Sequence, residues 1–324
     1  MKQTYKLLKG SLPIILVGAI LSTVMGVIAF VMGYNAETSW LYLRGACTII
    51  FAVLGFATMC YSGFVAFKAN NVNIKRIRKN YGFLRFGSYL AFGVTLFIFG
   101  LDLLKVILAT YENVYSNNFT IWRVLRLVFL LPASCHFLIM ALPSRYKRKR
   151  LEIPKPILYV TSSSTVLWAI FSLLTMYFTK QFSMMNILKI WQIVIYLVFA
   201  VFFLFEVKFE HVNQNVKGLI FTGSLSFIFT MAFSLTTLIC LALRIIPSNM
   251  SVSAPELFCP LGIGIYAFSR VCGVVNTMKY VINTSGSSTE KHHSHSHHGH
   301  HGHHGHHSHH SQHSSSNSSD STNN

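Results

Sequence analysis

The stretch Leu219–Leu243 reads LIFTGSLSFIFTMAFSLTTLICLAL and holds no charged side chain. A helix needs roughly 20 mostly apolar residues to cross the hydrocarbon core of a bilayer. Similar runs recur along the chain, in which 52% of the 324 residues are hydrophobic and 11% are charged. A soluble domain carries roughly 25% charged residues, so this chain lacks the charge to cover a surface that faces water. The composition predicts a multi-pass helical membrane protein.

Eight apolar runs have the length of a membrane-spanning helix, and they are continuous, unlike the alternating strands of an outer-membrane barrel. We predict an all-α fold, with a bundle of eight transmembrane helices in residues 1–284. A disordered His/Ser-rich cytoplasmic tail follows in residues 285–324, because such a segment has little apolar surface to bury. The predicted spans are Ser11–Met32, Gly45–Phe67, Phe86–Ala109, Ile121–Leu142, Pro156–Phe178, Ile187–Val207, Leu219–Leu243 and Leu257–Tyr280.

Basic residues alternate between the two ends of these spans. They gather at the N-terminus and in the second, fourth and sixth connections, whereas the odd connections hold few of them. Positive charge collects on the cytoplasmic side of a membrane protein, so both termini are predicted to be cytoplasmic, in the plasma membrane or an endomembrane. Two glycosylation sequons, at Asn118 and Asn249, fall on the predicted outer side.

The first span leaves one alternative open, because a basic start followed by an apolar run is also the pattern of a signal peptide. We interpret it as a retained anchor. Cleavage would leave seven spans with the N-terminus outside, which is the arrangement of a seven-helix receptor. That likeness is one of topology only, and topology is weak evidence for function.

The net charge of +18 predicts lipid partners rather than nucleic acid. The basic residues sit in the connections between spans, where they orient the protein and contact anionic headgroups of the bilayer. The sequence SRYKRKR, Ser144–Arg150, is the strongest basic surface. It is a candidate contact for a cytosolic protein partner, although its orienting role requires no such partner.

Ionisable side chains within the spans are candidate functional residues, because each costs several kcal/mol in a bilayer. Asp102 and Lys105 are three positions apart, so they share a helix face and can neutralise one another. The alternative is a polar site that faces the bundle interior. Arg126 lies near the outer end of the fourth span and is expected to extend to the headgroups. Arg270 is expected either to extend to the cytoplasmic surface or to pair with a carboxylate.

The fourth span contains a second candidate pocket. Pro132 should kink this helix and free a backbone carbonyl, and Ser134, Cys135 and His136 follow it directly. With Asp102 and Lys105, these three residues form the predicted binding site. The competing interpretation is structural, in which His136 bonds to a neighbouring helix and the couple on the third span only neutralises itself.

The tail carries the strongest metal-binding pattern of the chain, although an expanded short repeat in a tolerant tail is the interpretation that we prefer. Imidazole is a common ligand of Zn, Cu and Ni, so no cofactor is required but these metals can bind there. Fourteen of the sixteen histidines lie between Lys291 and His313. They are His292, His293, His295, His297, His298, His300, His301, His303, His304, His306, His307, His309, His310 and His313.

These observations predict a protein that is not an enzyme. Residues 1–284, the predicted bundle, contain no phosphate-binding loop, serine elbow or cluster of the HxxHH type. The first hypothesis is a receptor-like or scaffolding membrane protein with basic cytoplasmic loops. The alternatives are a small-solute transporter or channel, and a metal-handling protein whose tail feeds or regulates the bundle.

Overall fold

The computed structural model describes residues 2–35, 40–41, 45–69, 74, 77, 81–111, 117–142, 154–178, 187–212, 216–246 and 254–290. The chain divides into two compact units, Met1–Thr284 and Ser285–Asn324. Within the described residues of the first unit, eight helical segments are long and apolar enough to cross a membrane. The predicted all-α fold of a multi-pass membrane protein is therefore confirmed.

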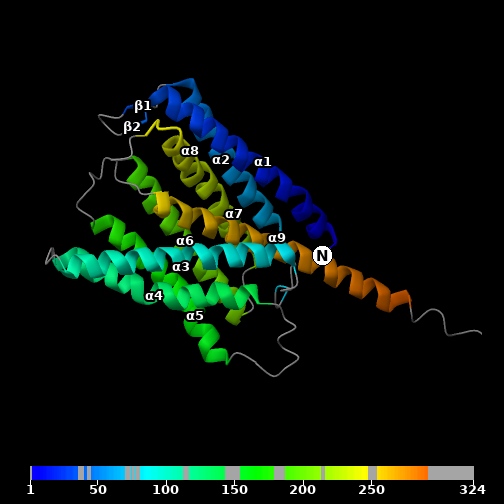
Figure 1. The fold of residues 1–324 in the computed structure, drawn as a ribbon. Helices are drawn as coiled ribbons and strands as arrows, with labels where there is room; N and C mark the ends of the chain where they lie inside the picture. The colour runs from blue at the N-terminus through cyan, green and yellow to red at the C-terminus, as the bar shows by residue number, and fades with distance from the viewer. Residues whose placement is uncertain are drawn as a thin grey trace, which may run out of the picture. The chain divides into compact units, whose positions relative to one another are not determined.

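The helices follow the order of the predicted spans (Figure 1). A pair of two-residue antiparallel strands, β1 (Tyr34–Asn35) and β2 (Trp40–Leu41), lies between the first two helices. The seventh span is made of three segments, because a π-helical segment, η2, interrupts it between α7 and α8. The bounds are α1 Lys2–Gly33, α2 Ala46–Lys68, α3 Gly82–Tyr111, α4 Asn117–Ala141, α5 Lys155–Phe178, α6 Ile187–Val212, α7 Val216–Phe229, η2 Thr230–Leu235, α8 Thr236–Ala242 and α9 Ala254–Glu290.

Helices that are consecutive in the chain pack against one another from α3 to α7, and α1 packs on α2. Figure 1 shows α4 beside α3 and α5. Other contacts join segments that are distant in sequence: α2 packs on α7, and α1 packs on η2 and α8. Short connections favour antiparallel packing of the consecutive helices.

Helix α9 is the most buried span of the bundle. In its apolar window 83% of the residues are buried, against 22–50% in the other seven spans. The Tyr266 ring meets Phe137 of α4 at 4.9 Å between centroids, and the Phe268 ring stacks on Phe227 of α7 at 4.4 Å. Phe268 also meets Phe83 of α3 at 6.3 Å. A helix in this position contacts several neighbours at once, so a movement of α9 changes the packing of all of them.

Close packing around α9 depends on glycine at position 264. A Cβ added to Gly264 would overlap the Thr230 hydroxyl of η2 and lie 2.8 Å from the Thr230 Cβ. Thr230 is fully buried and bonds its hydroxyl to the Ser226 carbonyl at 2.9 Å, so it has little freedom to move away. Small residues allow such close approach between membrane helices.

Replacing Gly264 with Ala is expected to lower the free energy of unfolding by about 1–3 kcal/mol, because it overpacks the contact between α9 and η2. Unfolding by SDS in mixed micelles would measure the change. The matched control is Gly93→Ala on α3, where an added Cβ meets nothing within 4 Å. That change should be neutral or stabilise the helix by up to about 1 kcal/mol. Equal effects at both positions would contradict the close contact.

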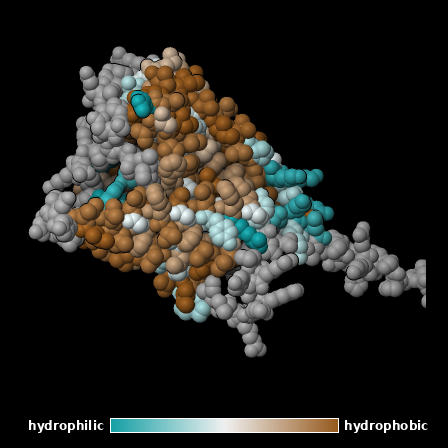
Figure 2. All heavy atoms as spheres, in the orientation of Figure 1, coloured by the Kyte–Doolittle hydropathy of each residue, from teal (hydrophilic) through white to brown (hydrophobic). Residues whose placement is uncertain are grey.

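The outer surface of the bundle is apolar, as the bilayer requires. Figure 2 shows hydrophobic residues over most of the described surface on one face, with hydrophilic residues near the N-terminal end of α1. Large apolar side chains such as Phe67 and Met32 are 78% and 73% exposed. A soluble monomer rarely exposes apolar surface on this scale, so this surface is suited to contact with lipid.

The predictions for the tail and for the two glycosylation sequons concern residues at or beyond the ends of the described helices. Helix α9 continues to Glu290, past the predicted start of the disordered tail at Ser285, because extending an existing helix requires no new nucleation. Asn118 falls in the first turn of α4. Asn249 and the histidines from His292 to His313 lie outside the described residues, so glycosylation there and metal binding by the tail remain predictions.

Candidate functional site

Three residues of the predicted pocket are consecutive on α4 and point in different directions. Ser134 is buried and donates a hydrogen bond to the Leu130 carbonyl at 2.9 Å, and its hydroxyl lies 3.0 Å from the Thr95 hydroxyl on α3. His136 is fully buried, whereas Cys135 is exposed. Successive helical residues are turned by roughly 100°, so Cys135 faces away from the bundle interior. A binding role for these residues remains a prediction.

Asp102 and Lys105 do not neutralise one another, because each pairs with a side chain of another helix. Asp102 Oδ2 lies 2.6 Å from Arg126 Nη2 of α4, and both side chains are at most 8% exposed. Lys105 Nζ lies 3.4 Å from Glu256 Oε1 of α9, in a pair that is partly exposed. The expectation that Arg126 extends to the headgroups is therefore wrong, since the carboxylate of Asp102 compensates its charge inside the bundle.

Side chains from four helices meet around the Asp102–Arg126 pair. We call this pair and its neighbours from α6 and α9 the α3–α4 network. Tyr196 of α6 and both Glu256 and Cys259 of α9 are close enough to interact electrostatically with Arg126. Tyr196 is also close enough to Cys259 to interact with its thiol. The guanidinium of Arg126 thus connects the charge of α3 to polar groups on the central helix.

A second set of interacting side chains joins α6 to α9, and we call it the α6–α9 network. Arg270 Nε lies 2.7 Å from Glu206 Oε1, and both side chains are 1% exposed. The same guanidinium forms an ion pair through Nη2 with Glu210. Tyr266 donates a hydrogen bond of 2.5 Å to Glu206 Oε1. Of the two expectations for Arg270, the structure shows the pair with a carboxylate.

The spacing of this network explains how it assembles, and the sequence could have indicated it. Glu206 and Glu210 are four residues apart on α6, and Tyr266 and Arg270 are four residues apart on α9. Side chains four apart share one face of a helix, so each helix presents two polar groups to the other. No role was predicted from the sequence for Glu206, Glu210 or Tyr266.

Aromatic rings fill the space between the two networks. Tyr196 of the α3–α4 network meets Phe199 at 5.9 Å, and Phe199 meets Phe203 at 6.3 Å between centroids. Phe203 then meets Phe137 at 6.0 Å, and Phe137 meets Tyr266 of the α6–α9 network at 4.9 Å. The two charged groups are therefore connected by packed side chains as well as by the backbone of α9.

The interior of the described bundle is not arranged as a metal centre. Among the described residues, no group of three or more His, Cys, Asp or Glu side chains is placed to hold a metal ion. The carboxylates of the α6–α9 network instead face a guanidinium, which cannot act as a ligand. Four acidic side chains in these parts of the chain instead form interhelical ion pairs: Asp102, Glu206, Glu210 and Glu256.

Comparisons with known proteins assign no family to this chain. No protein-family model, curated protein or solved structure matches it.

Proposed function

We propose that this chain is a non-enzymatic, receptor-like membrane protein in which α9 couples the α3–α4 network to the α6–α9 network. The supporting observation is that one buried helix contributes to both, through Glu256 and Cys259 near its start and through Tyr266 and Arg270 further along. At a rise of roughly 1.5 Å per residue, Glu256 and Arg270 are about 21 Å apart along the helix axis. A shift of α9 at one network therefore moves the residues of the other.

Buried ion pairs suit such a role because they favour a few discrete arrangements. Their net contribution to stability is small, since desolvation offsets the attraction, but separating one partner leaves a buried charge that is strongly unfavourable. Arg270 therefore either stays with Glu206 and Glu210 or requires new partners after a movement. Switching proteins use packed elements with two arrangements in this way.

The proposal places both termini and the even connections in the cytoplasm, where basic side chains contact anionic headgroups and a cytosolic protein partner. A reporter inserted into the second connection, between residues 70 and 80, is then expected to read as cytoplasmic, because this segment is rich in Lys and Arg. Protease protection in sealed microsomes would measure it. The matched reporter belongs in the fifth connection, between residues 179 and 186, and should be luminal. A reversal of the two results would contradict the orientation.

A transporter is the second candidate, because carboxylates buried in a membrane, here Glu206 and Glu210, often line ion paths. Flux measurements in proteoliposomes distinguish the two functions. Under imposed gradients of H⁺, Na⁺ or K⁺, the receptor-like proposal predicts that wild-type protein and the Glu206→Gln variant give the flux of protein-free liposomes. A flux that the wild type supports and Glu206→Gln abolishes would overturn the proposal in favour of transport.

A further inference from the structure

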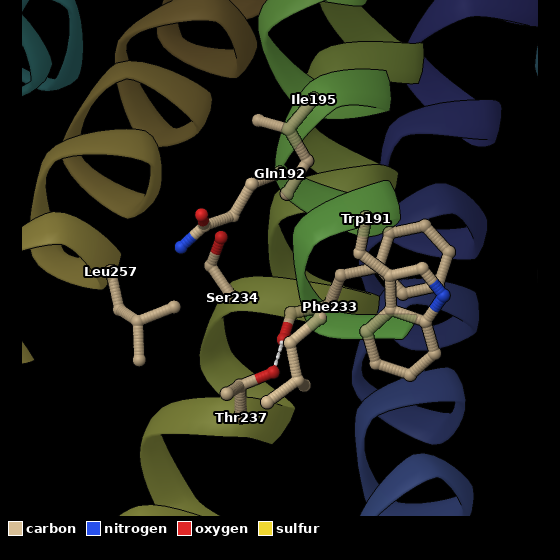
Figure 3. A pocket seen from close by; sticks show the side chains of 8 residues that line it. Trp191, Gln192, Ile195, Phe233, Ser234, Thr237 and Leu257 are labelled. Carbon is tan, nitrogen blue, oxygen red and sulfur yellow. Dashed lines mark hydrogen bonds between the residues drawn. The ribbon is translucent and has the colours of Figure 1, made fainter. Parts of the chain in front are cut away.

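A small cavity lies between α6, the η2–α8 segment and the beginning of α9. Its volume is about 10 Å³, which is close to the roughly 10–15 Å³ that one water molecule needs. Figure 3 shows the side chains that line it, with Gln192 from α6 and Ser234 from η2 turned toward one another. The cavity can therefore hold one group of the size of a water oxygen.

Two polar groups at this cavity require a hydrogen-bond partner. Gln192 Nε2 and Ser234 Oγ are buried and have no hydrogen-bond partner within the described parts of the chain. Their residues are only 8% and 2% exposed, so bulk water does not readily satisfy them. A buried polar group left without a partner costs about 1–3 kcal/mol. Each group would gain from an oxygen placed between them.

The π-helical segment η2 brings polar and aromatic groups to the same place. It provides both Phe233 and Ser234 to the cavity. The Phe233 ring stacks on Trp191 at 4.3 Å between centroids, and the Phe233 carbonyl accepts a hydrogen bond of 2.7 Å from Thr237. Segments of π-helix are rare and occur frequently at functional sites, which agrees with a site formed at this turn.

We propose that this cavity binds one neutral hydroxyl group, from water or from an organic molecule that carries a hydroxyl. The oxygen of the bound group accepts a hydrogen bond from Gln192 Nε2. It either donates a hydrogen bond to Ser234 Oγ or accepts one from it. The bound group is neutral because none of the residues that line the cavity is charged. The site goes beyond the receptor-like function and does not depend on it.

The test uses the full chain in lipid nanodiscs and radiolytic labelling in isotopically labelled water, read by mass spectrometry. Radicals formed from a bound water modify the nearest reactive side chains, which here are Trp191 and Phe233. The Gln192→Leu/Ser234→Ala variant removes both polar partners. The matched control is Ser226→Ala on α7, which removes a buried hydroxyl that bonds to the Thr222 carbonyl of its own helix at 2.8 Å.

A bound water predicts solvent-derived oxygen on Trp191 or Phe233 of the wild type and of Ser226→Ala, with a several-fold loss in the double variant. If the site holds an organic hydroxyl instead, native mass spectrometry should detect a compound that co-purifies with the wild type and not with the double variant. If the double variant does not fold, Ser234→Ala alone serves with the same two measurements. The proposal is overturned if the wild type shows neither signal, or if removal of the polar partners leaves the observed signal unchanged.

Discussion

Replacing Arg270 with Met is expected to lower the free energy of unfolding by about 3–5 kcal/mol. The buried carboxylate of Glu206 and the mostly buried one of Glu210 then lose the charge that compensates them. Glu206 and Arg270 are both 1% exposed, so water cannot replace the guanidinium without opening the bundle. Unfolding by SDS in mixed micelles would measure the loss. Lys279→Met is the matched control on the same helix and should have little effect, because Lys279 is exposed.

Neutralising the carboxylates tests whether charge, rather than packing, causes this loss. The Glu206→Gln/Glu210→Gln/Arg270→Met variant should recover most of the stability, because a buried ion pair replaced by neutral groups of similar volume is often tolerated. A single Arg270→Met variant within about 0.5 kcal/mol of the wild type would contradict the α6–α9 network, since changes of that size are typical of uninvolved surface positions.

Replacing Asp102 with Leu is expected to have an effect of similar size, about 3–5 kcal/mol, because it leaves Arg126 as an uncompensated buried charge. The matched change is Lys105→Met on the same helix. Its pair with Glu256 has a Lys105 side chain that is 41% exposed, and exposed pairs contribute only about 0–1 kcal/mol. The same unfolding assay compares the two variants.

These two variants also distinguish the observed pairs, Asp102–Arg126 and Lys105–Glu256, from the pair of Asp102 with Lys105 that their spacing predicted. If Asp102 and Lys105 neutralised one another, the two variants would destabilise the bundle to a similar extent. The observed pairing predicts instead that Asp102→Leu is far more destabilising and that adding Arg126→Met recovers stability. Equal losses for Asp102→Leu and Lys105→Met, with no recovery, would contradict the α3–α4 network.

The spans were predictable because the bilayer imposes their length and composition on the sequence directly. Runs such as Leu219–Leu243 carry this information locally, and Gly45–Phe67 lies within one residue of α2 at each end. Boundaries were less accurate where a helix continues beyond the hydrocarbon core. For example, α3 begins at Gly82 rather than at Phe86, since no lipid boundary ends a helix that extends into a connection.

The partners of the buried charges could not be predicted, because they depend on which helices are neighbours in space. Asp102 had a suitable cation three residues away, yet Arg126 of another helix forms the buried pair. The neighbours of α9 are far from it in sequence, and no local pattern placed this helix in the centre. The π-helical segment Thr230–Leu235 likewise has no marker in its sequence, because its residue types are those of the α-helical turns around it.

Coupling through α9 is tested most directly by the distance between spin labels on Val212 of α6 and Tyr280 of α9, which are 56% and 50% exposed. The exposed native cysteines Cys60 and Cys135 would first be replaced by Ala, and the protein measured in nanodiscs. Asp102→Asn, on another helix than either label, is predicted to shift or split the distance distribution. It leaves the Arg126 charge without its carboxylate and so changes how Arg126 interacts with Glu256 and Cys259 of α9. An unchanged distribution in a folded Asp102→Asn variant would contradict the coupling.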